Sequence, residues 1–410
     1  MISRRRLLKI SLAAGGIFAS RWSGTVPPSF ASTETPRRGK TLVVVFQRGG
    51  ADGLSMVVPH GDPAYAGLRP GIGIPPPGRP DGSVDLDGFF GLHPSLEPLH
   101  LYWKEKRLAA IHAVGSHDPT RSHFDAQDHM ETGTPGNKQT SDGWLGRMLR
   151  AYDPQTPPGL RSLAIGSTMP RILRGDPSAL ALPSVTSPRA KALFGSALAF
   201  EPLYAGAPSS SGEGDYAFRL FDRLRRFDFS SLPLASNANY PRSPFGQAMR
   251  EMATVIKANL GLVAGFADSG GWDTHVNQGG SIGQLATRLS DLAAGIAAFS
   301  KDLGRKLDDV VLLTMTEFGR TARENGNRGT DHGHGSAFFV LGGSVRGGKV
   351  YGKWPGLRPE TLYEGRDLAV TSDFRDVVSR ILSGHLGLQR LDGVFPQHPP
   401  AQEELRHLLN

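Results

Sequence analysis

Carboxylate and histidine side chains stand directly after, or just before, several apolar segments of this sequence. The residues of this kind are Asp52, Asp273, His275, Glu317, His332 and His334. Side chains two positions apart in an extended segment share one face, so Asp273 and His275 can bind one ion together, as can His332 and His334. For residues 331–334, the alternative is a solvated histidine-rich loop.

This set of side chains has a metal preference. Carboxylate oxygens combined with neutral imidazoles suit Zn²⁺, Mn²⁺ or iron, whereas Mg²⁺ and Ca²⁺ favour ligand sets made of oxygen alone. The chain has no cysteine, which excludes thiolate ligands, disulfides and a cysteine nucleophile. The sequence therefore predicts a divalent metal site, for zinc or manganese, that holds one or two ions.

A second group of candidates surrounds Ser122. This serine precedes a segment with a helical pattern, where a hydroxyl serves either as the helix N-cap or as a nucleophile assisted by the helix dipole and a metal ion. Arg121 and Arg320 can each bind a phosphate or sulfate through two hydrogen bonds, although each can equally pair with a neighbouring acid. His123 and His129 lie on the same predicted helix and receive no role.

Apolar β-branched segments predict the strands that position these residues. Residues 41–46 and 310–314 are apolar without alternation, which is typical of strands buried on both faces of a parallel sheet. Further strands are predicted at 108–114, 261–266 and 337–341. Because the carboxyl ends of parallel strands share one edge of the sheet, the polar residues that follow them are expected to converge there.

Helical segments alternate with these strands. One predicted helix begins near residue 122. Four others cover residues 142–152, 243–259, 282–304 and 372–386. This alternation predicts an α/β fold with a doubly wound, mostly parallel sheet and helices on both faces. Residues 153–240 contain short strands, prolines and a Ser/Gly-rich stretch, so we expect a loop-rich insertion or cap over the sheet within a single domain, residues 32–410.

The first residues have the features of an export signal. Residues 3–9 (SRRRLLK) followed by the apolar stretch 10–19 are typical of a twin-arginine signal peptide. A membrane anchor is the alternative, but this stretch has about half of the roughly 20 residues that a spanning helix needs. We expect residues 1–31 to be removed and the mature chain, without a stable membrane span, to reach the periplasm or the exterior through the twin-arginine translocase.

The charge of the chain argues against one class of partner. The 410 residues have a formal net charge of +8, but five positive charges and no acid lie within the first 31 residues, which leaves +3 for the rest. No dense basic run with interleaved aromatic residues remains. A nucleic-acid partner is therefore not expected.

Five short motifs together resemble a known family. They are RGGADGLS at 48–55, TRSHF at 120–124, GGWDTH at 270–275, TEFGRT at 316–321 and DHGHG at 331–335. Over nearly the whole mature chain, they resemble the exported family catalogued as domain of unknown function 1501. That family is similar to the alkaline phosphatase and sulfatase superfamily of metal-dependent hydrolases. The resemblance implies an alkaline-phosphatase-like fold.

The resemblance also implies roles for single residues. Asp52 resembles the metal-bridging aspartate of the superfamily, and Ser122 resembles its nucleophile at a helix start. Asp273 and His275 resemble a pair that binds one metal, although the superfamily usually separates these two residues by more positions. His332 or His334 resembles a late histidine ligand.

One departure from the superfamily pattern leaves two functional hypotheses open. Glu317 stands where the superfamily has Asp-His-Gly or Asp-Asn-Gly, and Phe318 replaces a ligand there. The first hypothesis is an exported metal-dependent hydrolase of small-molecule or polymeric phosphate or sulfate esters. The second is a non-catalytic exported metal-binding protein that binds a surface polymer or a partner. An oxidoreductase is disfavoured because residues 48–53 lack the Gly-x-Gly-x-x-Gly spacing of a dinucleotide site.

Overall fold

The computed structural model describes residues 39–152, 159–198, 213–398 and 405–410, so the predicted signal peptide lies outside the described residues. Its central sheet has nine strands: β1 (Thr41–Arg48), β5 (Leu108–Gly115), β6 (Ser162–Ile165), β7 (Ala179–Leu182), β8 (Ala264–Gly270), β9 (Val310–Thr316), β10 (Ser336–Gly342), β11 (Lys349–Tyr351) and β12 (Ser372–Asp373). They lie in the order β11, β5, β10, β9, β1, β8, β6, β7, and β12 pairs with β5.

The strand directions confirm a mostly parallel sheet. β1 is parallel to both β8 and β9, and β6 is parallel to β8 and β7. β10 is antiparallel to both β9 and β5, so β5 runs in the same direction as β9. As a result, the carboxyl ends of β1, β5, β8 and β9 and the amino end of β10 share one edge of the sheet.

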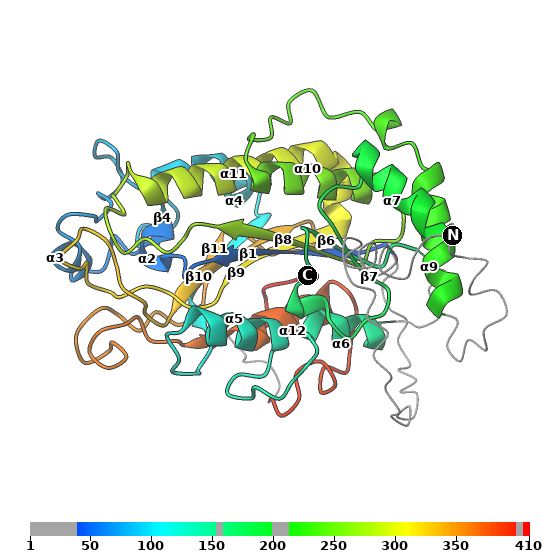
Figure 1. Ribbon diagram of the computed structural model, residues 1–410. Helices are drawn as coiled ribbons and strands as arrows, with labels where there is room; N and C mark the ends of the chain where they lie inside the picture. Colours follow the sequence, from blue (N-terminus) through cyan, green and yellow to red (C-terminus); the bar gives the residue numbers. More distant parts are fainter. Residues whose placement is uncertain (1–38, 153–158, 199–212, 399–404) are drawn as a thin grey trace.

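Helices cover both faces of this sheet, as the alternating pattern predicts (Figure 1). The helices on one face are α4 (Glu97–Lys104), α10 (Pro244–Lys257) and α11 (Gln284–Leu303); those on the other are α5 (His123–Thr132), α6 (Trp144–Ala151) and α12 (Phe374–Gly384). β1 contributes to both layers, because Val43 and Val45 belong to the first hydrophobic cluster and Leu42, Val44 and Phe46 to the second. All five side chains are fully buried, which explains why β1 is an unbroken apolar run.

The long helix α11 owes its position to one apolar stripe. Its core-facing side chains recur at intervals of three and four residues, which places them on one face of a helix; they are Leu285, Leu289, Leu292, Ile296 and Phe299. The helix is preceded by Gly283 and ends at Gly304, whose φ of +53° is unfavourable for other residues. The observed bounds agree with the predicted helix 282–304.

The segment expected to cap the sheet instead extends it. β6 and β7 pair in parallel beyond β8, so the hydrogen-bonding groups on that side of β8 are satisfied by the chain itself. Beside these strands, α7 (Pro188–Leu198) packs against α9 (Glu213–Arg226). β6 and β7 therefore belong to the central sheet, and the insertion or cap expected over residues 153–240 stays a prediction.

The connections between these strands and helices include small elements of their own. A three-stranded sheet consists of β2 (Val57–Val58), β3 (Val84–Asp85) and β4 (Gly91–Leu92). The short helices are α2 (Gly53–Met56), α3 (Tyr65–Leu68) and the 3₁₀ turns η1 (Pro94–Leu96), η2 (Arg171–Leu173), η3 (Phe229–Ser231) and η4 (Gly304–Asp309). Within the described ranges, no helix is both long and apolar enough to cross a membrane.

Candidate metal centre

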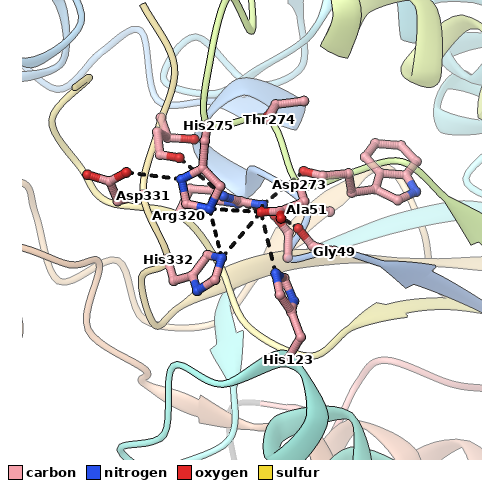
Figure 2. A network of polar contacts seen from close by, with 12 residues as sticks. Gly49, Ala51, His123, Asp273, Thr274, His275, Arg320, Asp331 and His332 are labelled. Atoms are coloured by element: carbon pink, nitrogen blue, oxygen red, sulfur yellow. Dashed lines mark hydrogen bonds and ion pairs between the residues drawn. The ribbon is translucent and has the colours of Figure 1, made fainter. Parts of the chain in front are cut away.

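The loops at the shared sheet edge bring together four side chains from three parts of the chain. Asp273 and His275 follow β8, His332 precedes β10, and His123 is the first residue of α5, which follows β5. Asp273 lies at the centre of the group (Figure 2). Its Oδ1 atom is 3.0 Å from Nε2 of His275, 3.2 Å from Nε2 of His332 and 3.4 Å from Nε2 of His123. We call these four residues the histidine cluster.

The other ring nitrogen of each histidine has its own partner. Nδ1 of His123 lies 2.7 Å from Oε1 of Glu317, and Nδ1 of His275 lies 3.0 Å from Oδ1 of Asp331. Nδ1 of His332 lies 2.8 Å from the backbone carbonyl oxygen of Arg121. Each ring is thus held from behind by an oxygen, an arrangement that orients histidine ligands in metal sites.

These partners determine where the protons are. A carbonyl oxygen and an ionised carboxylate can only accept hydrogen bonds, so Nδ1 of His332 and Nδ1 of His275 must donate. Asp331 is ionised because, although burial raises its pKa, hydrogen bonds from Asn325 and His275 outweigh that effect and lower the pKa. The Nε2 atoms of the two rings then face each other, 2.9 Å apart. Such a contact needs a proton or a metal ion between the two nitrogens.

His123 presents a further unsatisfied atom to the cluster. Its Nε2 is buried and has no hydrogen-bond partner, and 3.4 Å from Asp273 is too long for a good hydrogen bond. Together with Asp273 and His332, His123 offers ligand atoms that all lie within 4.8 Å of one another. The ring of Phe318 packs at 4.9 Å from the rings of both His123 and His332, so it forms an apolar wall of the cluster.

Arg320 keeps the central carboxylate ionised. Its buried guanidinium donates from Nη2 to Oδ1 of Asp273 at 2.6 Å. Burial alone would raise the pKa of Asp273, but the hydrogen bond and charge of Arg320 and the nearby His275 and His123 lower this pKa to about 2. Burial lowers the pKa of His332. An ionised carboxylate and a neutral imidazole are the forms that bind metals.

Neither of the two predicted arginine clamps is free. Arg320 also donates to the carbonyl oxygens of Gly50 at 2.6 Å and of Thr330 at 3.1 Å. Arg121 donates from Nη2 to Asp367 at 2.7 Å and to Glu364 at 2.6 Å. In this structure the donors of Arg320 and those on Nε and Nη2 of Arg121 bind acids and carbonyls of the protein, and the phosphate or sulfate clamp stays a prediction.

Glu317 lies behind the cluster rather than in it. Its side chain is fully buried, and Oε1 accepts hydrogen bonds from Nδ1 of His123, from the amide of Gly49 at 2.8 Å and from Gln127 at 2.9 Å. In this structure Glu317 is thus the outer hydrogen-bond partner of His123, and its role as a metal ligand stays a prediction. Burial raises the pKa of Glu317, but the bonds from His123 and Gln127 outweigh this effect and lower it.

Asp52 is also apart from the cluster. Arg69 donates to both carboxylate oxygens of Asp52, at 2.6 and 2.9 Å, and both residues are almost completely buried. Ser55 and Gln278 donate to Oδ2 at 2.8 and 2.7 Å. In this structure the guanidinium of Arg69 thus lies at both oxygens of Asp52, and the metal-bridging role of Asp52 stays a prediction.

The structure also decides between the two late histidines. The ring of His334 stacks on Tyr363, with centroids 4.4 Å apart and an interplanar angle of 12°, and it contributes no atom to the cluster. His332 points toward Asp273 instead (Figure 2). Side chains two positions apart share a face only in a regular strand, and β10 begins after both histidines, at Ser336.

The position of Ser122 bears on both roles considered for it, the helix N-cap and the nucleophile. It occupies the N-cap position of α5 with extended backbone angles, yet its side chain makes no capping hydrogen bond and is exposed. The hydroxyl lies one residue before His123 of the cluster. The hydroxyl group of Ser122 is therefore not used to cap the helix.

His123 is the cluster residue that sequence reasoning left unassigned. It follows no strand directly, and its neighbour Ser122 attracted the functional interpretation. The available signal was its position as the first residue of a helix that starts at the site edge, since a side chain there projects beyond the helix end.

The fold and the histidine cluster define the class of this protein: an α/β protein with a candidate metal site at the carboxyl edge of a mostly parallel sheet. The family model described as "Protein of unknown function (DUF1501)" matches residues 224–394, which confirms for this segment the family resemblance of the motifs. No curated protein sequence matches the chain.

Several solved structures are similar to this chain, among them sulfatases and alkaline-phosphatase-like enzymes. PsFucS1 sulfatase from Pseudoalteromonas sp. is 13% identical, with 91% of this chain and 72% of that chain covered and a TM-score of 0.40. Alkaline phosphatase from the Antarctic bacterium TAB5 is 12% identical (75% and 92% covered, TM-score 0.27). Phosphonate monoester hydrolase SpPMH from Silicibacter pomeroyi is 12% identical (88% and 77% covered, TM-score 0.30). At these scores the likeness carries no argument about activity.

The Asp52–Arg69 pair generates a stability prediction. Burial raises the pKa of Asp52, but the charge and hydrogen bonds of Arg69 outweigh it and lower the pKa in the folded state. Ionised Asp52 thus stabilises the fold above the unfolded-state pKa of about 4, and this contribution is lost as the pH falls through the lower folded-state value. We expect Asp52→Asn to lower the free energy of unfolding by about 3–5 kcal/mol at pH 7, because Arg69 becomes a buried unpaired charge.

Urea unfolding of the metal-free protein measures the free energy of unfolding of the wild type and of Asp52→Asn at pH 7 and below about pH 4. The difference between the two proteins should become smaller in acid. The matched control is Asp268→Asn, since Asp268 pairs with Arg48 but is 53% exposed and should change stability by less than about 1 kcal/mol. Equal losses for the two variants would contradict the assignment of Asp52.

Proposed function

We propose that this chain is a metal-dependent hydrolase of phosphate or sulfate esters that binds one divalent transition-metal ion through His123, His275, His332 and Asp273. The observation that carries the metal assignment is the 2.9 Å contact between the Nε2 atoms of His275 and His332. Nδ1 of each ring is bound to an oxygen acceptor, so both Nε2 atoms are directed at one position, where a metal ion would accept both lone pairs.

The donor set fits a zinc-type ion. Three imidazole nitrogens and one carboxylate oxygen are ligands that Zn²⁺ commonly takes. In a tetrahedral site with zinc–nitrogen distances of 2.0–2.1 Å, neighbouring ligand atoms are about 3.3 Å apart. Oδ1 of Asp273 lies 3.0, 3.2 and 3.4 Å from Nε2 of His275, His332 and His123, and the Nε2 atoms of His275 and His332 are 2.9 Å apart. The ligand atoms of His123, Asp273 and His332 all lie within 4.8 Å of one another, and the buried Nε2 of His123 has no other partner.

The count of one ion rests on the surroundings of Asp52. A second ion bridged by this carboxylate would have to displace Arg69, which donates to both oxygens and is itself buried. Phe318 supplies no ligand atom on the adjacent side. We therefore propose a mononuclear site.

The chemistry proposed for the site needs a Lewis acid, a nucleophile and access. A bound zinc-type ion would polarise an oxygen of the ester. Ser122, exposed and free of capping bonds, supplies a hydroxyl beside the site; it would attack phosphorus or sulfur, the alcohol would leave, and water would then hydrolyse the serine ester. Access is open, because the side chains of Asp273 and His275 are 46% and 37% exposed.

A second candidate function is metal binding without catalysis. Structural zinc sites have four protein ligands, whereas catalytic sites keep one position open, and the histidine cluster offers four. Arg121 and Arg320, the cations that would steady an anionic substrate, are committed to acids and carbonyls. In this case the ion would stabilise the loops for binding a surface polymer or a partner.

Metal content tests the site itself. We expect wild-type protein, loaded with Zn²⁺ or Mn²⁺ and desalted, to retain about one equivalent by elemental analysis. His275→Gln combined with His332→Gln should lose the ion because two of four ligands are removed. The control His100→Gln changes a histidine on α4, far from the cluster in the fold, and should retain it. Full retention by the double variant, or two equivalents in the wild type, would contradict the proposed site.

Hydrolysis is tested with aryl phosphate and aryl sulfate in the presence of Zn²⁺, Mn²⁺, Mg²⁺ or Ca²⁺. We expect activity that Asp273→Asn abolishes and that Ser122→Ala lowers by roughly 100-fold or more in kcat, because the nucleophile is lost. Ser243→Ala is the matched control, since Ser243 is also an N-cap serine, at α10. If wild-type protein that holds its ion turns over these esters no faster than Asp273→Asn with every metal, the hydrolase function is contradicted. The non-catalytic function is then favoured.

We also propose that the chain is exported through the twin-arginine pathway, in agreement with its N-terminal motif. The expected result of replacing Arg4, Arg5 and Arg6 by lysine is retention of the full-length chain in the cytoplasm, measured by cell fractionation. Periplasmic or secreted protein at the wild-type level in this variant would count against the pathway.

A further inference from the structure

A fully buried glutamine lies between the two loops that carry the ligands of the histidine cluster. Gln278 is 0% exposed. Its Oε1 accepts one hydrogen bond from the hydroxyl of Thr274 at 2.8 Å and another from the hydroxyl of Thr330 at 2.7 Å. Thr274 stands between Asp273 and His275, and Thr330 is two residues before His332. One side-chain oxygen therefore ties together the segments that supply three of the four proposed ligands.

The orientation of this amide is fixed from the other side. Nε2 of Gln278 donates to Oδ2 of Asp52 at 2.7 Å. An ionised carboxylate cannot donate, so a flipped amide would bring two acceptors together. Asp52 is in turn held by Arg69, which also donates to the carbonyl oxygens of Thr321 at 2.9 Å and Ala322 at 3.0 Å. The amide oxygen is thus directed at the two threonine hydroxyls.

Backbone contacts join the same two segments without the help of this side chain. The backbone amide of Thr330 donates to the carbonyl oxygen of Thr274 at 3.2 Å. The backbone amide of Gln278 donates to the carbonyl oxygen of Arg328 at 2.9 Å. The loops therefore have a means of staying together when the Gln278 side chain is changed. What the side chain adds is the fine spacing between them.

We propose that Gln278 is a positioning residue for the metal centre, which sets the separation of the Asp273–His275 pair from His332 through the hydroxyls of Thr274 and Thr330. This inference rests on the proposed metal site. Without the side-chain bonds, the two segments can shift relative to each other, and metal binding must restore their spacing at the expense of affinity. Partners behind the ligands typically change metal affinity by roughly 10–100-fold.

Two independent variants test the proposal. Gln278→Met keeps the approximate size of the side chain and removes all of its hydrogen bonds. Thr274→Val combined with Thr330→Val leaves Gln278 in place and removes the two hydroxyls, so it still tests the proposal if Gln278→Met does not fold. The matched control is Thr41→Val, because Thr41 is buried and its hydroxyl donates to the carbonyl of Leu262 at 2.7 Å, yet it stands at the amino end of β1, away from the site edge.

The measurements are the Kd for Co²⁺ and Zn²⁺ by chelator competition and the visible absorption spectrum of the Co²⁺ form, which reports the ligand geometry. Both site variants are expected to raise Kd by roughly 10–100-fold and to alter the spectrum, whereas the control changes stability and leaves Kd within about 2-fold. A loss of stability alone would not move the spectrum of the folded fraction.

The outcomes separate this inference from the proposed function. If wild-type protein binds neither ion, the metal site is refuted and this inference with it. If wild-type protein binds the ion and the folded site variants match its Kd and spectrum, Gln278 is an ordinary buried residue and only this inference is overturned.

Discussion

The buried guanidinium of Arg320 is the interaction on which the site depends. Its donors reach the carbonyl oxygens of Gly49 and Gly50 after β1, the carbonyl of Trp272 and the carboxylate of Asp273 after β8, and the carbonyl of Thr330 before β10. Arg320 and Thr330 both lie in the connection between β9 and β10, so one side chain joins three loops at the same sheet edge. A planar cation with five fixed donors can do this, whereas a lysine cannot. Without it, Asp273 would lose the charge that lowers its pKa, and the loops would lose their common partner.

Two ion pairs with buried arginines lie at this edge. Arg320 donates to Oδ1 of Asp273, the same oxygen that the three histidines approach, whereas Arg69 donates to both oxygens of Asp52. The side chain of Asp273 is 46% exposed, and that of Asp52 is almost completely buried. Gln278 connects Asp52 with the segments of the histidine cluster, since it bonds to Asp52 and to the hydroxyls of Thr274 and Thr330.

Much of the fold could be predicted from the sequence because its strands and helices are locally encoded. The unbroken apolar run of β1 and the three- and four-residue spacing of α11 indicated both elements, and strands alternating with helices indicated a mostly parallel sheet. β8 was predicted to end early, at residue 266, because polar Asp268 and Ser269 continue the strand. The short strands β6 and β7 were interpreted as a cap, since pairing with an open sheet edge depends on tertiary geometry and leaves no periodic signal.

The sequence by itself determined that histidines and carboxylates, without any cysteine, stand at the ends of strands, and this pattern predicted a metal site at one sheet edge. Asp273, His275 and His332 are among the residues that the pattern named. Only the tertiary structure decided which side chains lie together: His123 joins this group from α5, while Asp52 binds Arg69 and Glu317 binds His123. The physical reason is that residue type and spacing state what a side chain can bind, but the partner that it does bind depends on which groups other segments place within about 3 Å of it.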